Sequence, residues 1–321
     1  MRQRNQTASK YSAQNKMSKP TICIIGPGIV GGATGKVLAS KGFDVSFLGG
    51  NISKIEKLRK EGYSAYERGD LFSNGYGYDF DISFLTVPTP TRNGKTDLSA
   101  MQQASIDLGK RLKKTKKYHL VVVKSTVPPG TTEKIVIKTI EKYSGKKIGR
   151  DFGACMNPEY LREATALQDT LNPWIILIGE YDKKSGDLLA SVYEGKFDCP
   201  IFRCELHEAE MQKYVHNLFN ATKISYFNEM RQVADSIGAD ADKIFKYAAI
   251  SCEGMWNPKY GIRNLGPFSG SCLPKDTQAF LHWSKTLGVD IPLLRTVISV
   301  NNKLVEKLGL REFSFKTESL L

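Results

Sequence analysis

The sequence predicts an α/β fold in which a parallel-sheet domain, residues 20–203, precedes an all-helical domain, residues 204–310. Two observations support this. The first half alternates short apolar runs with helical stretches, as in a sheet whose parallel strands are joined by helices. The second half has apolar residues at helical spacing over long stretches with few Gly or Pro. A length of 321 residues is enough for two domains with separate cores.

The clearest element of the first half is a strand, a glycine turn, a helix and a second strand in succession. The apolar run 21–25 enters the turn, a helical stretch follows to about residue 41, and an apolar strand occupies 45–48. In a G-x-G-x-x-G turn the glycines allow a tight bend, close approach of a pyrophosphate and close packing of helix on strand. The sequence therefore predicts a Rossmann-type unit with a bound dinucleotide held at Gly26, Gly28, Ile29, Val30 and Gly31.

The segment that distinguishes NAD from NADP departs from the usual pattern. An acidic residue normally ends the second strand and binds the ribose hydroxyls of NAD. Here the strand ends in Leu48-Gly49-Gly50-Asn51, and Lys54 follows. Nothing in this segment repels a 2′-phosphate and Lys54 could attract one, so NAD versus NADP stays open. Asn51 and Lys54 are expected to contact the cofactor.

Two more apolar runs, 81–87 and 120–123, predict buried strands that end in polar, proline-rich turns. In open α/β sheets ligands bind beyond the carboxyl ends of the strands. These turns are therefore expected to line the cofactor through Val87, Pro88, Thr89, Ser125 and Thr126. A further strand is predicted at 174–178.

The second half begins with a predicted helix at 205–237, on which Lys213 and Asn217 stand four residues apart and share a face. A lysine on a helix is usually solvated, but a Lys–Asn pair can also stabilise an oxyanion. Another helix is predicted to follow Pro292 and run to Lys307. Between them lies Gly270-Ser271-Cys272-Leu273-Pro274-Lys275-Asp276. Small residues leave room at the sulfur and a nearby cation favours the reactive thiolate; the alternative is a structural Cys beside a surface Lys–Asp pair.

Composition narrows the classes of partner. The net charge is +13, but the sequence has no basic motif interleaved with aromatic residues, which argues against nucleic acid as a partner. No apolar run reaches the roughly 20 residues that a membrane-spanning helix needs. Six scattered cysteines and four scattered histidines predict no metal site, no disulfide framework and a cytoplasmic protein. Residues 1–19, basic and without acids, and residues 311–321 are predicted to be tails, the first of them disordered.

Seven motifs in order resemble the UDP-glucose/GDP-mannose dehydrogenase family. They are the glycine turn, Val87-Pro88-Thr89-Pro90, Ser125-Thr126-Val127-Pro128, Asn157-Pro158-Glu159-Tyr160-Leu161-Arg162-Glu163, Glu210-Met211-x-Lys213-Tyr214-x-x-Asn217, Asn228-Glu229 and the cysteine segment 270–276. The resemblance implies four-electron oxidation of a sugar C6 alcohol to a carboxylate, with two NAD reduced. The predicted reaction is UDP-glucose to UDP-glucuronate, although the motifs do not separate UDP-glucose from GDP-mannose. It also implies a homodimer that pairs through the helical domain.

By the same resemblance, Cys272 captures the aldehyde as a thiohemiacetal that is oxidised to a thioester, and Lys213 and Asn217 stabilise oxyanions. Asp276 and a water near Thr126 assist proton transfer, and Glu159 is the base for thioester hydrolysis. Tyr160, Leu161, Arg162 and Gly270 join Glu159, Lys213, Asn217 and Cys272 in holding the substrate. Glu163 and Lys275 complete the cofactor contacts.

Family members usually carry another α/β domain that grips the nucleotide, and this sequence ends at Leu321, near where that domain would begin. Two alternatives to a nucleotide-sugar dehydrogenase therefore stay open. One is a non-catalytic dimerising subunit, or a truncated relative, that partners a full-length enzyme. The other is a two-domain dehydrogenase of a small hydroxy acid, which would not need Cys272.

Overall fold

The computed structural model describes residues 19–72, 80–262, 266–270 and 272–310. It divides into two compact units, residues 1–215 and 216–321, which are described separately. The division falls inside helix α7 (Leu206–Ser236), whereas the predicted boundary lies just before this helix. The two predicted tails lie outside the described residues, except for Lys19, which donates to the backbone oxygens of Lys41 and Gly42.

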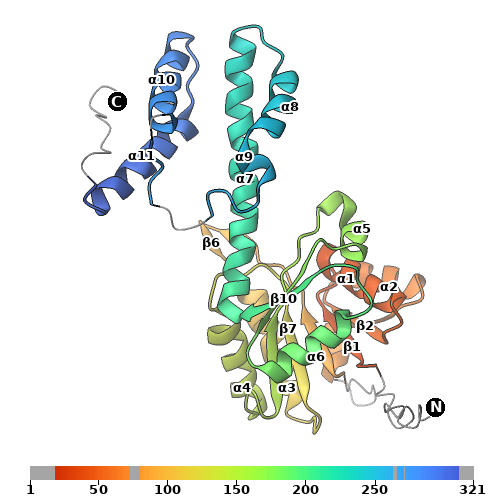
Figure 1. Ribbon diagram of the computed structural model, residues 1–321. Helices are drawn as coiled ribbons and strands as arrows, with labels where there is room; N and C mark the ends of the chain where they lie inside the picture. Colours follow the sequence, from red (N-terminus) through yellow and green to blue (C-terminus); the bar gives the residue numbers. More distant parts are fainter. Residues whose placement is uncertain (1–18, 73–79, 263–265, 271, 311–321) are drawn as a thin grey trace, which may run out of the picture. The chain divides into compact units, whose positions relative to one another are not determined.

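The first unit is built on an eight-stranded sheet in the order β10-β9-β8-β7-β4-β1-β2-β3 (Figure 1). Its strands are β1 (Ile22–Ile25), β2 (Val45–Gly49), β3 (Ser64–Glu67), β4 (Ile82–Leu85), β7 (His119–Val123), β8 (Phe152–Met156), β9 (Ile176–Glu180) and β10 (Ile201–Glu205). A small hairpin, β5 (Thr91–Arg92) with β6 (Lys95–Thr96), lies between β4 and β7 in the sequence. The predicted strands at 45–48, 81–87 and 120–123 are confirmed, and the strand predicted at 174–178 lies two residues later.

The sheet is parallel from β3 to β8, but β9 pairs with β8 in the antiparallel direction. The predicted parallel sheet is therefore confirmed except at the β8–β9 pair, because β9 and β10 pair in parallel again. The chain leaves β8 at Met156 and returns into β9 from the same end, through residues 157–175, instead of crossing over the sheet. This return places the segment that begins at Asn157 at the carboxyl end of β8.

Helices cover both faces of this sheet because successive side chains of a strand point to opposite faces. Ile22 and Ile24 of β1 belong to one buried cluster, which includes side chains of α1 (Ile29–Ser40), α2 (Ile52–Lys60) and α6 (Lys183–Tyr193). On the other face, α3 (Ser99–Leu112), the π-helical turn Thr132–Ile137 and α4 (Lys138–Ser144) pack on β7 and β8. The first unit thus has three layers, as the Rossmann-type prediction requires. The short helix α5 (Ala166–Leu171) packs on α1.

The second unit is helical in its described residues. It consists of the rest of α7, α8 (Ala241–Ser251), α9 (Glu253–Trp256), α10 (Leu273–Thr286) and α11 (Pro292–Lys307). Its core contains Val233, Leu281, Ile291 and Ile298, and the Glu229 carboxylate accepts the backbone N–H of Leu293 at the start of α11. The helices predicted at 205–237 and after Pro292 are confirmed. Among the described residues no helix combines the length and apolar character needed to cross a membrane.

Candidate active site

The glycine turn between β1 and α1 is fixed against the end of β4. Gly26 has φ of +97°, and a Cβ there would lie 2.9 Å from the backbone of Thr86. A Cβ at Gly31 would lie 2.4 Å from Thr86 Oγ1, which donates hydrogen bonds to the carbonyl oxygens of Ile25 and Gly26. Side chains are therefore excluded at both glycines. At Gly28 a Cβ would meet no atom within 4 Å, so this side of the turn is open to a ligand.

A crevice of about 660 Å³ lies beyond the turn, where the strand order reverses between β1 and β4. Eleven of the predicted cofactor residues line it: Gly26, Gly28, Ile29, Val30, Asn51, Lys54, Val87, Pro88, Thr89, Ser125 and Thr126. Gly31 packs beneath the turn, and Glu163, at the start of the 3₁₀ turn Glu163–Thr165, does not line the crevice. The open glycine turn and the volume of the crevice fit a dinucleotide.

The two proline-rich loops that line this crevice hold each other in place. The hydroxyl of Thr89, after β4, donates to the backbone oxygen of Thr126, after β7, at 2.8 Å. In return the hydroxyl of Ser125 donates to the backbone oxygen of Val87 at 2.6 Å. The hydroxyl-bearing residues that the sequence singled out thus cross-link the two loops, and this role is structural whatever else they bind.

Glu159 and Lys213 form a buried ion pair at the inner wall of the crevice. The Lys213 side chain is only 4% exposed, and its Nζ lies 3.0 Å from Glu159 Oε1 and also donates to the backbone oxygen of Glu159. The second carboxylate oxygen of Glu159 accepts the backbone N–H of Leu161 at 2.8 Å. Glu159 itself lines the crevice. Two predicted catalytic groups from distant parts of the sequence are therefore in direct contact.

The residues that follow Glu159 are held by side-chain contacts of their own. The Tyr160 hydroxyl donates to Gln212 at 2.5 Å, and burial raises the pKa of this phenol. The Arg162 guanidinium binds Asp169 through two nitrogens, at 3.0 and 2.8 Å, and these hydrogen bonds hold the pKa of the Asp169 carboxyl far below its usual range. Arg162 is thus engaged within the chain, and any contact with a substrate falls to its backbone or to its remaining donors.

Sequence reasoning did not single out Lys124, the residue that directly follows β7. Its side chain is buried, and Nζ donates to Asn157 Oδ1 at 2.8 Å. The pKa of Lys124 is lowered to about 8, mainly by burial; Glu159 opposes this shift and Lys213 contributes to it. Lys124 therefore brings a second amino group into the electrostatic environment of the Glu159–Lys213 pair. The only signal in the sequence is a lysine between a strand and a polar turn, which usually indicates a solvated side chain.

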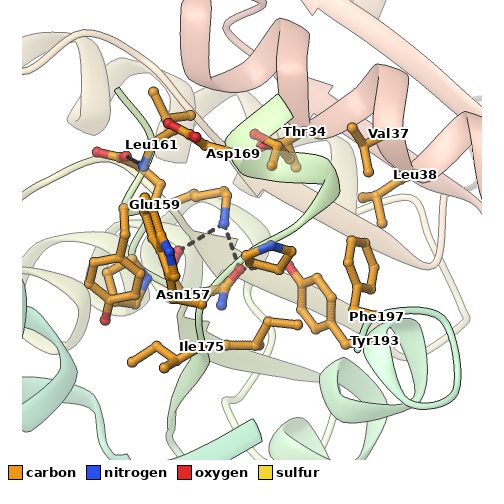
Figure 2. Close-up of a pocket in the computed structure, with 17 residues that line it drawn as sticks. Thr34, Val37, Leu38, Asn157, Glu159, Leu161, Asp169, Ile175, Tyr193 and Phe197 are labelled. Carbon is orange, nitrogen blue, oxygen red and sulfur yellow. Dashed lines mark hydrogen bonds between the residues drawn. The ribbon is translucent and has the colours of Figure 1, made fainter. Parts of the chain in front are cut away.

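Asn157 connects this lysine to two other parts of the sheet domain. Its Oδ1 also accepts the Tyr193 hydroxyl at 2.6 Å, and its Nδ2 donates to the backbone oxygen of Leu177 at 2.8 Å. Figure 2 shows Asn157 in the wall of a second, smaller cavity, with Glu159 and Tyr193 on opposite sides of it. Asn157 therefore anchors the segment that carries Glu159.

The second unit holds the remaining predicted residues. Cys272 is exposed and is the N-cap of α10, with its backbone oxygen accepting the N–H of Asp276 at 2.9 Å. Lys275 and Asp276 form an ion pair, whose hydrogen bond raises the pKa of the lysine. Gly270 has φ of +85°, and Asn217 is exposed on α7. Over the described residues, no three His, Cys, Asp or Glu side chains gather as a metal site would need.

Comparison with known families gives two consecutive matches. Residues 72–196 match the NAD binding domain of the UDP-glucose/GDP-mannose dehydrogenase family, and residues 207–303 match the central domain of the same family. GDP-mannose 6-dehydrogenase of Pseudomonas syringae pv. tomato is 36% identical over 304 residues, which are 89% of this chain and 68% of that protein. UDP-glucose 6-dehydrogenase AglM of Haloferax volcanii is 32% identical over 306 residues, 89% of this chain and 70% of that protein.

Solved structures agree with these sequence matches. A ternary complex of GDP-mannose dehydrogenase from Pseudomonas aeruginosa superposes with a TM-score of 0.82 at 33% identity, covering 89% of this chain and 69% of the other. UDP-glucose dehydrogenase from Pyrobaculum islandicum has a TM-score of 0.68 at 31% identity, covering 91% and 72%. The resemblance that the seven motifs indicated is thus confirmed over most of the chain.

Proposed function

The chain belongs to the UDP-glucose/GDP-mannose dehydrogenase family, and from this premise we propose that it is an NAD-dependent nucleotide-sugar 6-dehydrogenase. The proposed reaction is the four-electron oxidation of a sugar C6 alcohol to a carboxylate. UDP-glucose is the substrate that the sequence predicted. The related proteins include both GDP-mannose and UDP-glucose dehydrogenases, so GDP-mannose is an equal candidate.

The observation that carries this proposal is the Glu159–Lys213 pair in the wall of the dinucleotide crevice. Lys213 supplies a buried cation and Glu159 a carboxylate that lines the crevice, and such a pair suits a reaction in which an alcohol oxygen loses its proton. If the chain were a two-domain dehydrogenase of a small hydroxy acid, nothing would explain why this pair and the Cys272 motif both match the nucleotide-sugar dehydrogenase family.

The proposed roles follow the chemistry of the residues. Gly26, Gly28 and the loops after β4 and β7 would hold the dinucleotide, whose nicotinamide, when bound, accepts a hydride in each of the two oxidations. Lys213 and Asn217 stabilise negative charge on the substrate oxygen, and Asp276 and a water near Thr126 assist proton transfer. Tyr160, Leu161, Arg162 and Gly270 hold the sugar and phosphates, and Glu163 and Lys275 contact the cofactor.

Cys272 is proposed to act on the aldehyde. Its Sγ bonds to the carbonyl carbon and the oxygen takes up a proton, which gives a thiohemiacetal; oxidation of this adduct gives a thioester. Water then breaks the C–S bond while Glu159 accepts the proton of that water, so a carboxylate and a free thiol are released. The N-cap position of Cys272 suits this chemistry because anions are stabilised at helix N-termini.

The test is to incubate the purified chain with NAD and either UDP-glucose or GDP-mannose and to follow reduced cofactor. The proposal expects two NADH per sugar oxidised, and no such turnover in Cys272→Ala. Cys252→Ala is the matched control because Cys252 is the other exposed cysteine of the described residues. Turnover of a small hydroxy acid that is unchanged in Cys272→Ala would refute the proposal, and stable binding to a full-length relative without turnover would favour a non-catalytic subunit.

We also propose that the chain forms a homodimer through its second unit. Large apolar side chains stay exposed there, among them Leu218, Phe219, Ile224, Tyr247 and Ile250. A groove of about 550 Å³ with a mainly apolar lining runs among α7, α8, α10 and α11. Apolar surface on this scale marks an interaction site. Light scattering should give about twice the 35.8 kDa of one chain, and a monomer at micromolar concentration would contradict the proposal.

Since all six cysteines are free thiols, we further propose a reducing, cytoplasmic location.

A further inference from the structure

The ribose end of the cofactor crevice lies at the carboxyl end of β2. In this fold an acidic residue there binds the 2′- and 3′-hydroxyls of NAD, and a cation nearby accommodates the 2′-phosphate of NADP. In this chain β2 ends at Gly49, followed by Gly50 and Asn51, and all three line the crevice. The position that would carry the carboxylate therefore has no side chain.

The acidic residues nearest to the end of β2, on the neighbouring elements, are paired with arginines. Glu67 ends β3 in register with Gly49, but it faces Arg59 at 3.9 Å and lines neither hollow at this end of the sheet. Asp107 of α3 lines an adjoining hollow of about 250 Å³, where it binds Arg68 at 2.6 Å. No carboxylate in the described part of this end is thus set to bind the ribose hydroxyls.

The glycine turn explains why an acid is missing. A Cβ built on Gly49 would lie 2.8 Å from Cδ of Pro27, the second residue of the turn, and 3.1 Å from its Cγ. A real Cβ does not approach carbon this closely, so Pro27 must move before any side chain can stand at position 49. Pro27 and Gly49 are therefore one coupled feature, and it leaves no carboxylate at the end of β2 that would repel a phosphate.

Positive charge replaces the missing acid. Lys54, on the first turn of α2, lines the crevice together with Gly50 and Asn51. Among the described residues no carboxylate lies within ion-pair distance of its ammonium, and the side chain is exposed. Arg68 lines the adjoining hollow, which shares Gly49 and Gly50 with the crevice, and its side chain is 51% exposed. Both cations thus flank the glycines at the end of β2.

From this arrangement we propose that the crevice accepts a 2′-phosphate, so that the chain binds NADP at least as tightly as NAD, with Lys54 as the residue that determines this. The inference rests on the cofactor crevice of the proposed function and does not depend on the sugar that is oxidised. A lysine suits the role because it binds phosphate as a compact point charge. Selectivity follows because NAD carries only a neutral hydroxyl at the position where NADP carries the phosphate that Lys54 would neutralise.

The test compares binding of NAD and NADP, and of 5′-AMP and 2′,5′-ADP as short probes, by isothermal titration calorimetry at fixed salt. The wild-type chain should bind NADP at least as tightly as NAD, and 2′,5′-ADP more tightly than 5′-AMP. Lys54→Ala should weaken NADP by about ten- to a hundredfold, since one charge-assisted hydrogen bond is lost, and leave NAD within about twofold. Lys57→Ala, on the same helix but outside both hollows, is the matched control. Pro27→Ala combined with Gly49→Asp should restore preference for NAD.

Three results would overturn the inference: NAD binding at least tenfold tighter than NADP, Lys54→Ala weakening both cofactors equally, or neither cofactor binding. The sugar assay separates this from the proposed function. Tight NAD binding with sugar turnover would refute the inference and leave the dehydrogenase, whereas NADP binding without turnover of either sugar would support the inference and refute the dehydrogenase. Absence of binding by both cofactors would refute both.

Discussion

Replacement of Lys124 by Met should change how the stability of the first unit depends on pH. Lys124 is fully buried and its pKa is lowered from 10.5 to about 8, with burial as the largest cause, Glu159 opposing and Lys213 adding to the shift. Between these two values the unfolded chain binds more protons at this position than the folded chain. Stability therefore rises with pH across this window, and below pH 8 the full penalty of the buried charge applies.

The size of the effect follows from the shift. A difference of about 2.5 units corresponds to about 3 kcal/mol in total, of which about 2–3 kcal/mol falls between pH 7 and pH 10. Met has a similar length and no charge, so the variant lacks this contribution. The free energy of unfolding of wild type, relative to Lys124→Met, should rise by this amount from pH 7 to pH 10. The constant loss of the hydrogen bond to Asn157 does not enter the comparison.

The assay is urea unfolding at the two pH values with a reporter in the first unit. Trp174 lies in that unit, and Phe at positions 256 and 283 removes the tryptophan signal of the second unit, which can unfold separately. Lys138→Met, at an exposed position of α4, controls for the change in net charge. A difference between wild type and Lys124→Met that stays constant within about 0.5 kcal/mol would refute the burial of a shifted lysine.

Three further predictions concern the site and its support. Gly31→Ala should weaken NAD binding at least about tenfold by calorimetry, because its Cβ would lie 2.4 Å from Thr86 Oγ1 and would displace the glycine turn; unchanged affinity would contradict the close packing. Lys213→Met should lower turnover by at least about a hundredfold with the circular dichroism spectrum retained, since a buried donor is removed, and turnover within tenfold of wild type would exclude the oxyanion role. Glu210→Gln should destabilise the first unit by about 1–3 kcal/mol in urea, because the buried carboxylate accepts two backbone N–H groups and the Thr132 hydroxyl; an unchanged midpoint would show that this carboxylate is not needed.

The part of the fold that the sequence predicted is the part that local patterns determine. The glycine turn could be predicted from the sequence because it requires glycine at fixed positions. Gly26 has φ of +97°, and Gly31 makes a contact that leaves no room for a Cβ. The helices at 206–236 and 292–307 could be read from apolar spacing and from Pro292 at the first turn. Strand β10 was missed because its side chains are largely exposed at the sheet edge and Phe202-Arg203-Cys204 carries no buried-strand pattern.

The direction of β9 and the burial of Lys124 depend on contacts between residues far apart in the sequence. Nothing within 174–178 states that the strand runs against β8, because this follows from the return of the chain through 157–175. Lys124 is buried because Asn157, 33 residues later, meets its Nζ. Asn157 is in turn held by Tyr193, a further 36 residues along. In the sequence Asn157 is recognised only as one residue of a family motif. Its function as an anchor is seen only in the structure, where it forms hydrogen bonds with Lys124 and Tyr193.

The contact between Lys213 and Glu159 changes how the two predicted roles combine. The motifs predict that Lys213 stabilises an oxyanion and that Glu159 is the base for hydrolysis. In the structure each of the two side chains uses part of the hydrogen-bonding capacity of the other. An ammonium has three donors, and Lys213 directs two of them to the backbone oxygen and the carboxylate of Glu159. One donor is left, within the described residues, for a substrate oxygen. Glu159 accepts one bond at each carboxylate oxygen, and a carboxylate can accept about four. The pair therefore has hydrogen-bonding capacity left for an oxyanion and a water without breaking apart.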